Sequence, residues 1–369
     1  MVSVRLLSIV CCPGCRAAFH SSDDALECPS CGGHYRARDG FLDLRPRERF
    51  SEQTKYLDET LHADARHETV SPPLLSAGVR HHMLVRFLQP APGDRVLDLG
   101  CGSGRVLVWN QPLGPYQVGL DVSPFFAAEA RASVDLALGD LRRLPFADCS
   151  FNKAYALDVF EHLSRDALGQ MLDEASRILE PAGQLFVYSH VRKNARIALG
   201  LRAINRLARG LERAGLVDLS QERLRKSDHV NPLADIPDLE QVVGQAGFRV
   251  AHIRYYTPLV AGFIENILLR LGERWLTRRA QRKAAAQAPA IAATGRTPGA
   301  AGAGPGQADP DAQEASRASR AAFKARVARG GPIYFLLHVL TWISRLDLVL
   351  WGRVRSGPFF ALLVKERAR

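Results

Sequence analysis

The chain has 369 residues, 47% of them hydrophobic, which suffices for one catalytic domain with appendages and a sizeable buried core. Its formal net charge of +11 belongs to one end, because residues 270–369 hold 18 Lys and Arg against 6 Asp and Glu, whereas residues 1–269 hold 31 and 32. This distribution argues against a catalytic face that forms a polyanion groove. It favours a basic appendage that contacts a membrane surface, RNA or nothing at all.

The first residues, MVSVRLLSIV, run directly into two cysteines without a long apolar segment or a small-residue cleavage site. We therefore expect no signal peptide and a cytoplasmic protein, with peripheral contact to the inner face of the membrane as a variant. Five of the seven cysteines lie within residues 11–31. Such clustering is typical of metal binding in a reducing compartment rather than of a disulfide framework.

Two CxxC knuckles, CPGC and CPSC, are separated by 12 residues, and four thiolates with this spacing can close around one Zn²⁺. We expect a structural zinc ribbon over residues 1–48. Its predicted ligands are Cys12, Cys15, Cys28 and Cys31. Cys11 precedes the pattern and is expected to be a bystander, and His34 is a weaker alternative ligand. A redox-active pair of CxxC motifs is the competing interpretation, but no thioredoxin-like βαβ pattern surrounds them.

From residue 93 onward, short apolar runs alternate with helical or Gly- and Pro-bearing stretches, the pattern of a parallel sheet with crossover helices. The predicted strands are RVLDLGC, YQVGLDV, VDLALGD, FNKAYALDV, GQLFVYSHV and, after a predicted helix DLEQVVGQAG, FRVAHIRYY. We therefore predict a doubly wound α/β core over residues 93–270. Residues 49–92 are predicted to be a connector that is polar at first and then helical through LLSAGVRHHMLVRFL.

The run RVLDLGCGSGRV predicts a strand, a Gly-rich turn and a helix, with a glycine spacing that differs from dinucleotide-binding loops. Backbone can approach a ligand closely at such glycines, which suits a nucleoside that carries an amino-acid group. Acidic residues follow the first three strands, where they can receive an ammonium, the ribose hydroxyls and the adenine amino group. The candidate cofactor-binding residues are Asp98, Gly100, Cys101, Gly102, Gly104, Asp121, Val122, Asp140, Leu141 and Leu157.

This order of motifs, over roughly residues 93–192, resembles class I S-adenosylmethionine-dependent methyltransferases, in particular the methyltransferase type 11-like group. The resemblance implies a Rossmann-like sheet of seven strands and S-adenosyl-L-methionine as cosubstrate. Asn152, where the family usually has Asp, is a departure with local effect. Residues 11–46, with Tyr35 and the turn at 39–41, resemble Trm112-like zinc domains, which accompany or activate methyltransferases. They also resemble the N-terminal ribbon of large-subunit rRNA guanine-N1 methyltransferases.

Methyl transfer from a sulfonium mainly requires that the acceptor be positioned and deprotonated, so few catalytic groups are expected. The run LDVFEHL places Asp158, Glu161 and His162 after the fourth strand, at the edge where open α/β sheets bind substrates. His162 is the first candidate for a general base, followed by Glu161 and His229, with His190 as a pocket residue. The Glu-His pair resembles that of quinone-precursor O-methyltransferases, which implies metal or substrate positioning. Helix capping or core packing is the alternative role.

Three segments lie outside this pattern. Residues 195–226 are a basic insertion that predicts an amphipathic helix, either packed with a solvated face or facing an anionic acceptor or membrane. Its predicted apolar stripe is Ile197, Leu201, Ile204, Ala208 and Leu211. Residues 284–330 are expected to be a flexible linker. Residues 331–369 hold an apolar run too short to span a bilayer, and predict a helix and an edge strand that complete the sheet, or an interfacial helix.

The sequence contains no NPPY-like tetrad and no catalytic cysteine pair, which favours methylation of O or C over N, on a small or lipid-like molecule. Peripheral membrane contact is expected through residues 195–226 and 331–355. Methylation of rRNA or tRNA, with the ribbon and the basic tail binding phosphates, is the first alternative. Residues 284–330, however, hold a single aromatic side chain for base stacking, Phe323. A non-catalytic partner protein that binds the cofactor is the second alternative.

Overall fold

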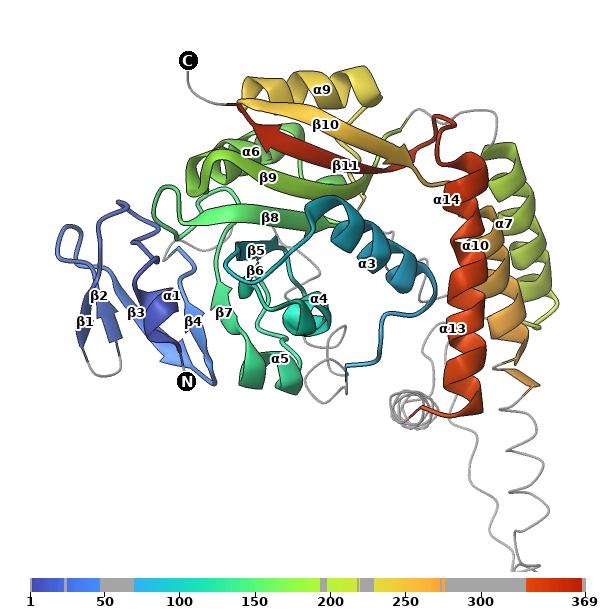
Figure 1. The fold of residues 1–369 in the computed structure, drawn as a ribbon, viewed down its shortest axis with the longest axis horizontal. Helices are drawn as coiled ribbons and strands as arrows, with labels where there is room; N and C mark the ends of the chain where they lie inside the picture. Colours follow the sequence, from blue (N-terminus) through green and yellow to red (C-terminus); the bar gives the residue numbers. More distant parts are fainter. Residues whose placement is uncertain are drawn as a thin grey trace, which may run out of the picture.

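Eleven strands form one sheet in the computed structural model, in the order β1-β2-β3-β4-β7-β6-β5-β8-β9-β11-β10 (Figure 1). The structure describes residues 2–22, 25–46, 70–192, 198–217, 219, 229–272, 274–275 and 330–366. The predicted linker therefore lies outside the described residues except for Gly330, and the predicted basic insertion and connector are described only in part.

Five parallel strands form the centre of the sheet. They are β7 (Asp135–Leu138), β6 (Tyr116–Asp121), β5 (Arg95–Leu99), β8 (Phe151–Leu157) and β9 (Leu179–His190). Two antiparallel neighbours follow, β11 (Pro358–Lys365) and β10 (Phe248–Tyr255). These seven strands carry the predicted strand sequences, so the predicted doubly wound α/β class with seven strands is confirmed.

The prediction that the C-terminal strand lies at the edge of the sheet is wrong. β11 lies between β9 and β10 and pairs antiparallel with both. Its central residues, Phe359 to Leu363, are each at most 5% exposed, because both faces of a central strand are covered. The edge belongs to β10, where charged side chains such as Arg249 and Arg254 interrupt the apolar ones.

The N-terminal segment extends the same sheet. Helix α1 (Val4–Leu7) precedes three short antiparallel pairings among β1 (His20–Ser22), β2 (Ala25–Glu27), β3 (His34–Arg38) and β4 (Phe41–Asp43). β4 then pairs parallel with β7, with Leu42 opposite Ala137. The cysteine-bearing segment is therefore joined to the parallel strands of the sheet by backbone hydrogen bonds.

Helices cover both faces of the parallel strands (Figure 1). On one face, α6 (Arg165–Ile178) and α9 (Ile236–Gln245) pack in the same core as Leu97 and Leu99. On the other, α3 (Leu75–Leu88), α4 (Arg105–Asn110) and α5 (Ala128–Ser133) pack with Val96. Successive residues of β5 thus enter opposite cores, as the two-residue period of a strand requires. Two short 3-10 segments, η3 (Gln111–Leu113) and η4 (Phe160–His162), connect these elements.

A layer of helices stands at the end of the sheet that is far from the cysteines (Figure 1). It contains α7 (Ala198–Arg213), α10 (Leu259–Phe263) with the π-helix η5 (Ile264–Leu269), α13 (Pro332–Ser344) and α14 (Leu346–Trp351). Ala208 of α7 is buried with Ile267 of η5, and Ile204 and Leu211 pack against them. The sequence predicts an apolar run too short for a bilayer, but α13 and α14 together form a 20-residue segment that is, by length and composition alone, long and apolar enough to cross one; 28% of its apolar stretch is buried in the domain.

Candidate functional site

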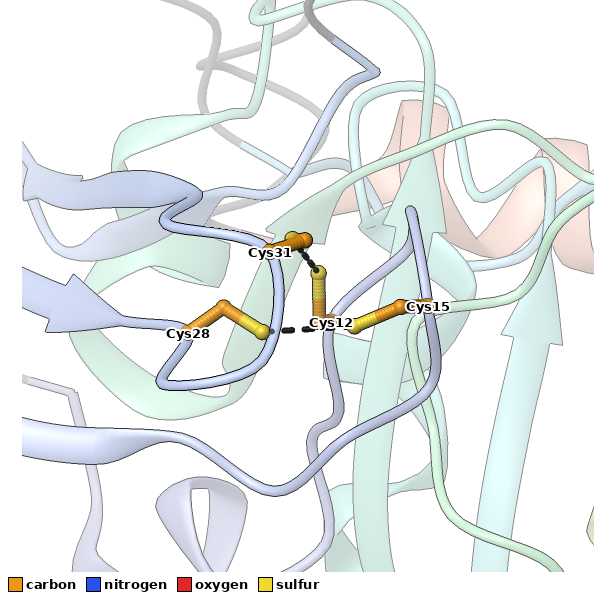
Figure 2. Close-up of side chains that lie close together, drawn as sticks. All are labelled: Cys12, Cys15, Cys28 and Cys31. Carbon is orange, nitrogen blue, oxygen red and sulfur yellow. Dashed lines mark hydrogen bonds between the residues drawn. The ribbon is translucent and has the colours of Figure 1, made fainter.

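The four predicted metal ligands lie together (Figure 2). The Sγ atoms of Cys12 and Cys31 are 3.5 Å apart, those of Cys15 and Cys28 are 3.3 Å apart, and all four lie within 4.8 Å of one another. Four sulfurs around a tetrahedral Zn²⁺ at 2.3 Å would be separated by about 3.8 Å, so this donor set fits the ion. Burial raises the pKa of Cys12, but backbone N–H groups from the knuckle outweigh this and lower the pKa, which favours the thiolate.

The two other candidates in this segment lie outside the cluster. Burial raises the pKa of Cys11 to about 11, so its sulfur is held as a thiol. Its backbone N–H donates to the Pro145 carbonyl at 3.0 Å. The ring of His34 pairs with the Glu27 carboxylate instead, with Nδ1 and Oε1 3.0 Å apart. The donor set is therefore the four cysteines alone.

The cysteine segment contacts the loop that follows β7. A β-bridge joins Val10 to Phe146, and the Ala147 N–H donates to the Ile9 carbonyl at 2.8 Å. Arg16, next to the first knuckle, donates from Nη2 to Glu174 of α6 at 2.7 Å, and Glu174 Oε2 accepts the Leu144 N–H at 2.8 Å. One buried carboxylate thus joins the cysteine segment, α6 and the loop that carries Asp140.

The glycine loop between β5 and α4 adopts a backbone that side chains rarely allow. Gly100 has φ +76°, and a Cβ placed on it would lie 2.7 Å from Cγ2 of Val159. Gly104 has φ +78°, and its Cβ would lie 2.7 Å from Cβ of Ala130. Left-handed φ and close packing together require glycine at both positions. The loop N–H groups are thereby held at the carboxyl end of β5.

Asp98 is 3% exposed within this loop region. Burial raises the pKa of Asp98 well above its ordinary value, although the Tyr155 hydroxyl forms a hydrogen bond with its carboxylate. A buried carboxylate without a cation is costly, so the site favours a positively charged partner. The ammonium group of an amino acid is one such partner.

The second predicted carboxylate is held against the same loop. Asp121 Oδ2 accepts the Gly102 N–H at 2.7 Å, and Oδ1 accepts the Ser123 N–H at 2.9 Å. Burial raises the pKa of Asp121 despite these donors. Because β5 and β6 are parallel neighbours, Asp98 and Asp121 reach the same edge of the sheet.

The remaining predicted cofactor residues surround this edge. The Asp140 carboxylate already has a partner, since Arg142 Nε lies 3.0 Å from each of its oxygens and Nη2 lies 2.9 Å from Oδ2. A ligand amino group would therefore have to share or displace Arg142. Cys101 is buried in the core beside α4, whereas Val122, Leu141 and Leu157 are partly exposed. Asn152, the departure from the family pattern, bridges locally, accepting the Arg95 N–H and donating to Asp94, each at 2.8 Å.

The predicted catalytic residues form a cluster at the carboxyl ends of β8 and β9. Glu161 is 1% exposed, and its Oε2 accepts the Ser189 hydroxyl at 2.7 Å. Its Oε1 lies 3.3 Å from His190 Nδ1. Burial raises the pKa of Glu161, but the nearby His190, a backbone N–H and the Ser189 hydroxyl together outweigh burial and lower it, which favours the carboxylate. Glu161 therefore positions His190 and has little access to a substrate.

Two histidines from distant segments meet beside this carboxylate. The Glu161 carbonyl accepts the N–H groups of Val230 and Asn231 at 2.8 and 2.9 Å, which fixes the loop that carries His229. The rings of His162 and His229 contact edge to face, with centroids 4.8 Å apart. Both rings are partly exposed. Ligand atoms of Glu161, His162 and His229 lie within 4.8 Å of one another, so the cluster can bind a proton or a cation.

Sequence reasoning missed the cationic wall of this site. Arg80 of α3 pairs with Asp158, with Nη1 and Oδ2 2.8 Å apart, and its guanidinium lies 5.3 Å from the Tyr188 ring centroid. Tyr188 in turn contacts the ring of His190 at 5.5 Å. The available signal was Arg80 itself, a charged residue on an otherwise apolar face of the predicted helix. Sequence alone does not show which site such a residue reaches.

Comparison with known proteins places this domain. Residues 97–187 match the family described as a methyltransferase domain. The chain is 33% identical over 129 residues to methyltransferase GfsG of Streptomyces halstedii, covering 31% of this chain and 45% of that protein. It is 29% identical over 175 residues to the ubiquinone biosynthesis O-methyltransferase of Azorhizobium caulinodans, covering 46% and 64%. The solved phosphoethanolamine N-methyltransferase 2 of Haemonchus contortus has a TM-score of 0.45 at 17% identity, covering 85% of this chain and 59% of that one.

The family match begins at residue 97, after the cysteine segment, so the resemblance of that segment to Trm112-like domains stays a prediction. The chain spans 45% and 43% of the length of the first two curated relatives that it matches. The matched region contains the glycine loop, the three carboxylates and the Glu-His pair described above. Residues 97–187 therefore form a methyltransferase domain, and the relatives that match this region support the class I S-adenosylmethionine-dependent type.

Proposed function

We propose that the protein transfers a methyl group from S-adenosyl-L-methionine to an oxygen or carbon atom of a small or lipid-like acceptor. The observation that carries the proposal is the buried Asp98 carboxylate with the partly exposed Asp121 carboxylate, both beside a glycine loop with left-handed backbone. In this assignment Asp98 holds the methionine ammonium and Asp121 accepts the ribose hydroxyls. Asp140 and Leu141 lie at the adenine end, where Arg142 moves aside or shares the carboxylate.

The acceptor is assigned to the cluster around His162. A hydroxyl acceptor attacks the methyl carbon of the sulfonium, the carbon–sulfur bond breaks, and S-adenosylhomocysteine leaves as a neutral thioether. The hydroxyl proton passes to a ring nitrogen of His162, which acts as the general base. His229 orients this ring through their edge-to-face contact, and Glu161 orients His190. For a carbon acceptor the same base removes the proton from the methylated carbon.

The same three side chains support a second role for the cluster. Ligand atoms of Glu161, His162 and His229 lie close enough to coordinate one divalent cation, which would bind and acidify a hydroxyl acceptor. Activity that requires added Mg²⁺ or Mn²⁺ in protein whose zinc content is unchanged would favour this role. Activity indifferent to both ions favours His162 as the base.

The four cysteines are proposed to hold a structural Zn²⁺. All four donors come from the chain, so no position is left for a water or a substrate, and the ion would supply cross-linking rather than chemistry. Because β4 pairs with β7, the cross-link also stabilises the part of the sheet that leads into the loop carrying Asp140.

Binding of the cofactor is tested by thermal shift. S-adenosylmethionine at about 100 times its Kd should stabilise the wild type by about 2.7 kcal/mol, or about 5–10 °C. Asp121→Ala should abolish this shift, whereas Asp173→Ala, on the exposed face of α6, should retain it. A shift that survives in Asp121→Ala would make the ribose assignment wrong.

Turnover is tested by formation of S-adenosylhomocysteine with a phenolic lipid acceptor and, separately, with ribosomal RNA. His162→Ala should lose turnover while keeping the thermal shift, and His20→Ala, an exposed histidine near the cysteines, should keep both. Turnover on RNA would replace the proposal with the nucleic-acid alternative. Cofactor binding without turnover on any acceptor would favour a non-catalytic partner protein.

A further inference from the structure

The C-terminal helices present an apolar surface to the outside of the molecule. The side chains of Phe335, Val339, Trp342, Leu346 and Val349 follow one another at spacings of four and three residues, and are 69%, 37%, 64%, 38% and 73% exposed. This spacing puts them on one face of a continuous helical path through α13 and α14. Leu336 and Leu350 widen the face. We call these seven side chains the apolar ridge.

The opposite face of the same helices is buried and carries polar side chains beside apolar ones such as Leu337 and Leu348. Thr341 Oγ1 accepts the Leu75 N–H at 2.7 Å and so caps α3. The Asp347 carboxylate accepts the N–H groups of Val260 and Ala261, both at 2.9 Å, and so caps α10. Thr341 and Asp347 of this segment therefore stabilise the domain, whereas the side chains of the apolar ridge stay exposed.

These buried contacts argue against insertion of the segment across a bilayer. If α13 and α14 left the domain, three backbone N–H groups would lose their acceptors and the Asp347 carboxylate would enter hydrocarbon. Each lost acceptor costs about 1–3 kcal/mol, and an ionised carboxylate costs more. The segment is therefore held on the domain, with the ridge facing outward.

The surroundings of the ridge are basic. Helix α7 joins the same layer through α10 and carries four exposed arginines, Arg202, Arg206, Arg209 and Arg213 (Figure 1). Arg353 and Arg355 follow α14 and are also exposed. Within Pro332–Trp351, all of it described, the only acidic residue is the buried Asp347. A helical layer that carries both an exposed apolar face and exposed arginines is complementary to an anionic lipid surface, which offers hydrocarbon and phosphate together.

The ridge is linked to the acceptor cluster through α3. Thr341 caps the first turn of α3, and Arg80 in the next turn pairs with Asp158 beside Tyr188. Glu265 of η5 accepts the Ser76 N–H at 2.6 Å and ties the same turn to the helical layer. The helices that carry the ridge thus contact the helix whose Arg80 forms one wall of the site.

We propose that the apolar ridge and the arginines of α7 dock the protein on the surface of an anionic bilayer. The bilayer then presents the acceptor to the site. The second statement rests on the proposed methyltransferase function, whereas docking itself does not. The partner is a lipid surface containing acidic headgroups, and the methyl acceptor is a molecule dissolved in that surface.

The test is flotation of the full-length protein with vesicles of phosphatidylcholine alone or with about 30% phosphatidylglycerol. Binding should require the anionic lipid and weaken as salt rises from about 0.1 M to about 0.5 M. Val349→Ser should lower the vesicle partition coefficient about tenfold, because Val349 loses its insertion into hydrocarbon. Val4→Ser makes the same change at an equally exposed valine of α1 and should bind as wild type. Arg202→Ala with Arg206→Ala should weaken binding about tenfold or more.

Each outcome decides the matter. No binding to anionic vesicles overturns the docking surface, as does equal loss in Val349→Ser and Val4→Ser. A wild-type dimer in solution that Val349→Ser converts to a monomer, without vesicle binding, assigns the ridge to a second copy instead. Protein that resists extraction from vesicles by alkaline carbonate shows a spanning segment. Wild-type protein that binds vesicles but shows no thermal shift with S-adenosylmethionine would refute the methyltransferase proposal and leave the docking proposal standing.

Discussion

Glu174 connects the cysteine segment to the loop after β7 that carries Asp140. Its replacement should therefore lower both the stability of the protein and its affinity for the cofactor. The carboxylate is 5% exposed and accepts four hydrogen bonds, from Arg16 Nη2 at 2.7 Å, Arg177 Nε at 2.9 Å, Arg177 Nη2 at 2.8 Å and the Leu144 N–H at 2.8 Å. Breaking a buried ion pair costs about 3–5 kcal/mol. Glu174→Gln keeps one acceptor oxygen, and Arg177 keeps Asp148 and two carbonyls, so we expect a loss of about 2–3 kcal/mol.

The free energy of unfolding from urea titration measures this loss, and the melting temperature should fall by about 4–12 °C. Because Leu144 belongs to the loop that carries Asp140, the Kd for S-adenosylmethionine should rise about threefold to tenfold by titration calorimetry. Asp173→Asn, the neighbouring exposed acid on α6, is the matched control and should change neither quantity. Unfolding free energies within about 0.5 kcal/mol for the two variants would refute the argument.

Further predictions concern single residues of the glycine loop, of β5 and its approach, and of the cysteine cluster. Gly100→Ala should abolish the cofactor thermal shift through its left-handed φ and the 2.7 Å clash, whereas Gly169→Ala, in an open position of α6, should raise stability by about 0.5–1 kcal/mol. Asp98 has a raised pKa, so the native state binds the proton more tightly and ligand-free stability falls as pH rises above about 4; Asp98→Asn should remove this slope and stabilise the ligand-free protein while losing cofactor binding. Burial raises the pKa of Asp94, but hydrogen bonds from Lys153 and its other neighbours outweigh burial and lower it. Asp94→Asn should therefore lower stability at neutral pH, a change opposite in sign to that of Asp98→Asn in the same denaturation series. Cys28→Ser should eliminate bound zinc in metal analysis and lower the melting temperature of the cooperative transition that contains the sheet; an unchanged sheet transition would show that the cysteine segment unfolds alone.

Sequence alone determined the class of the core, because the signals for it are local. Each predicted strand is a short apolar run whose neighbours break it, and parallel strands bring their carboxyl ends to one edge without further information. Asp98 and Asp121 could therefore be nominated together from strand ends that are separated by 22 residues of chain. The two CxxC knuckles were equally local, since a tight turn fixes each pair of sulfurs.

Tertiary structure decided the pairings that depend on distant segments. The sequence of a strand does not specify which strands pair with it. The position of β11 between β9 and β10 was therefore decided by the packing of the whole sheet. Likewise β4 joined β7, Arg80 reached Asp158, and His229 met His162 through contacts across dozens of residues. The orientation of α13 and α14 was decided in the same way, because an apolar helix has no preferred inward face until residues such as Thr341 and Asp347 cap the ends of other helices.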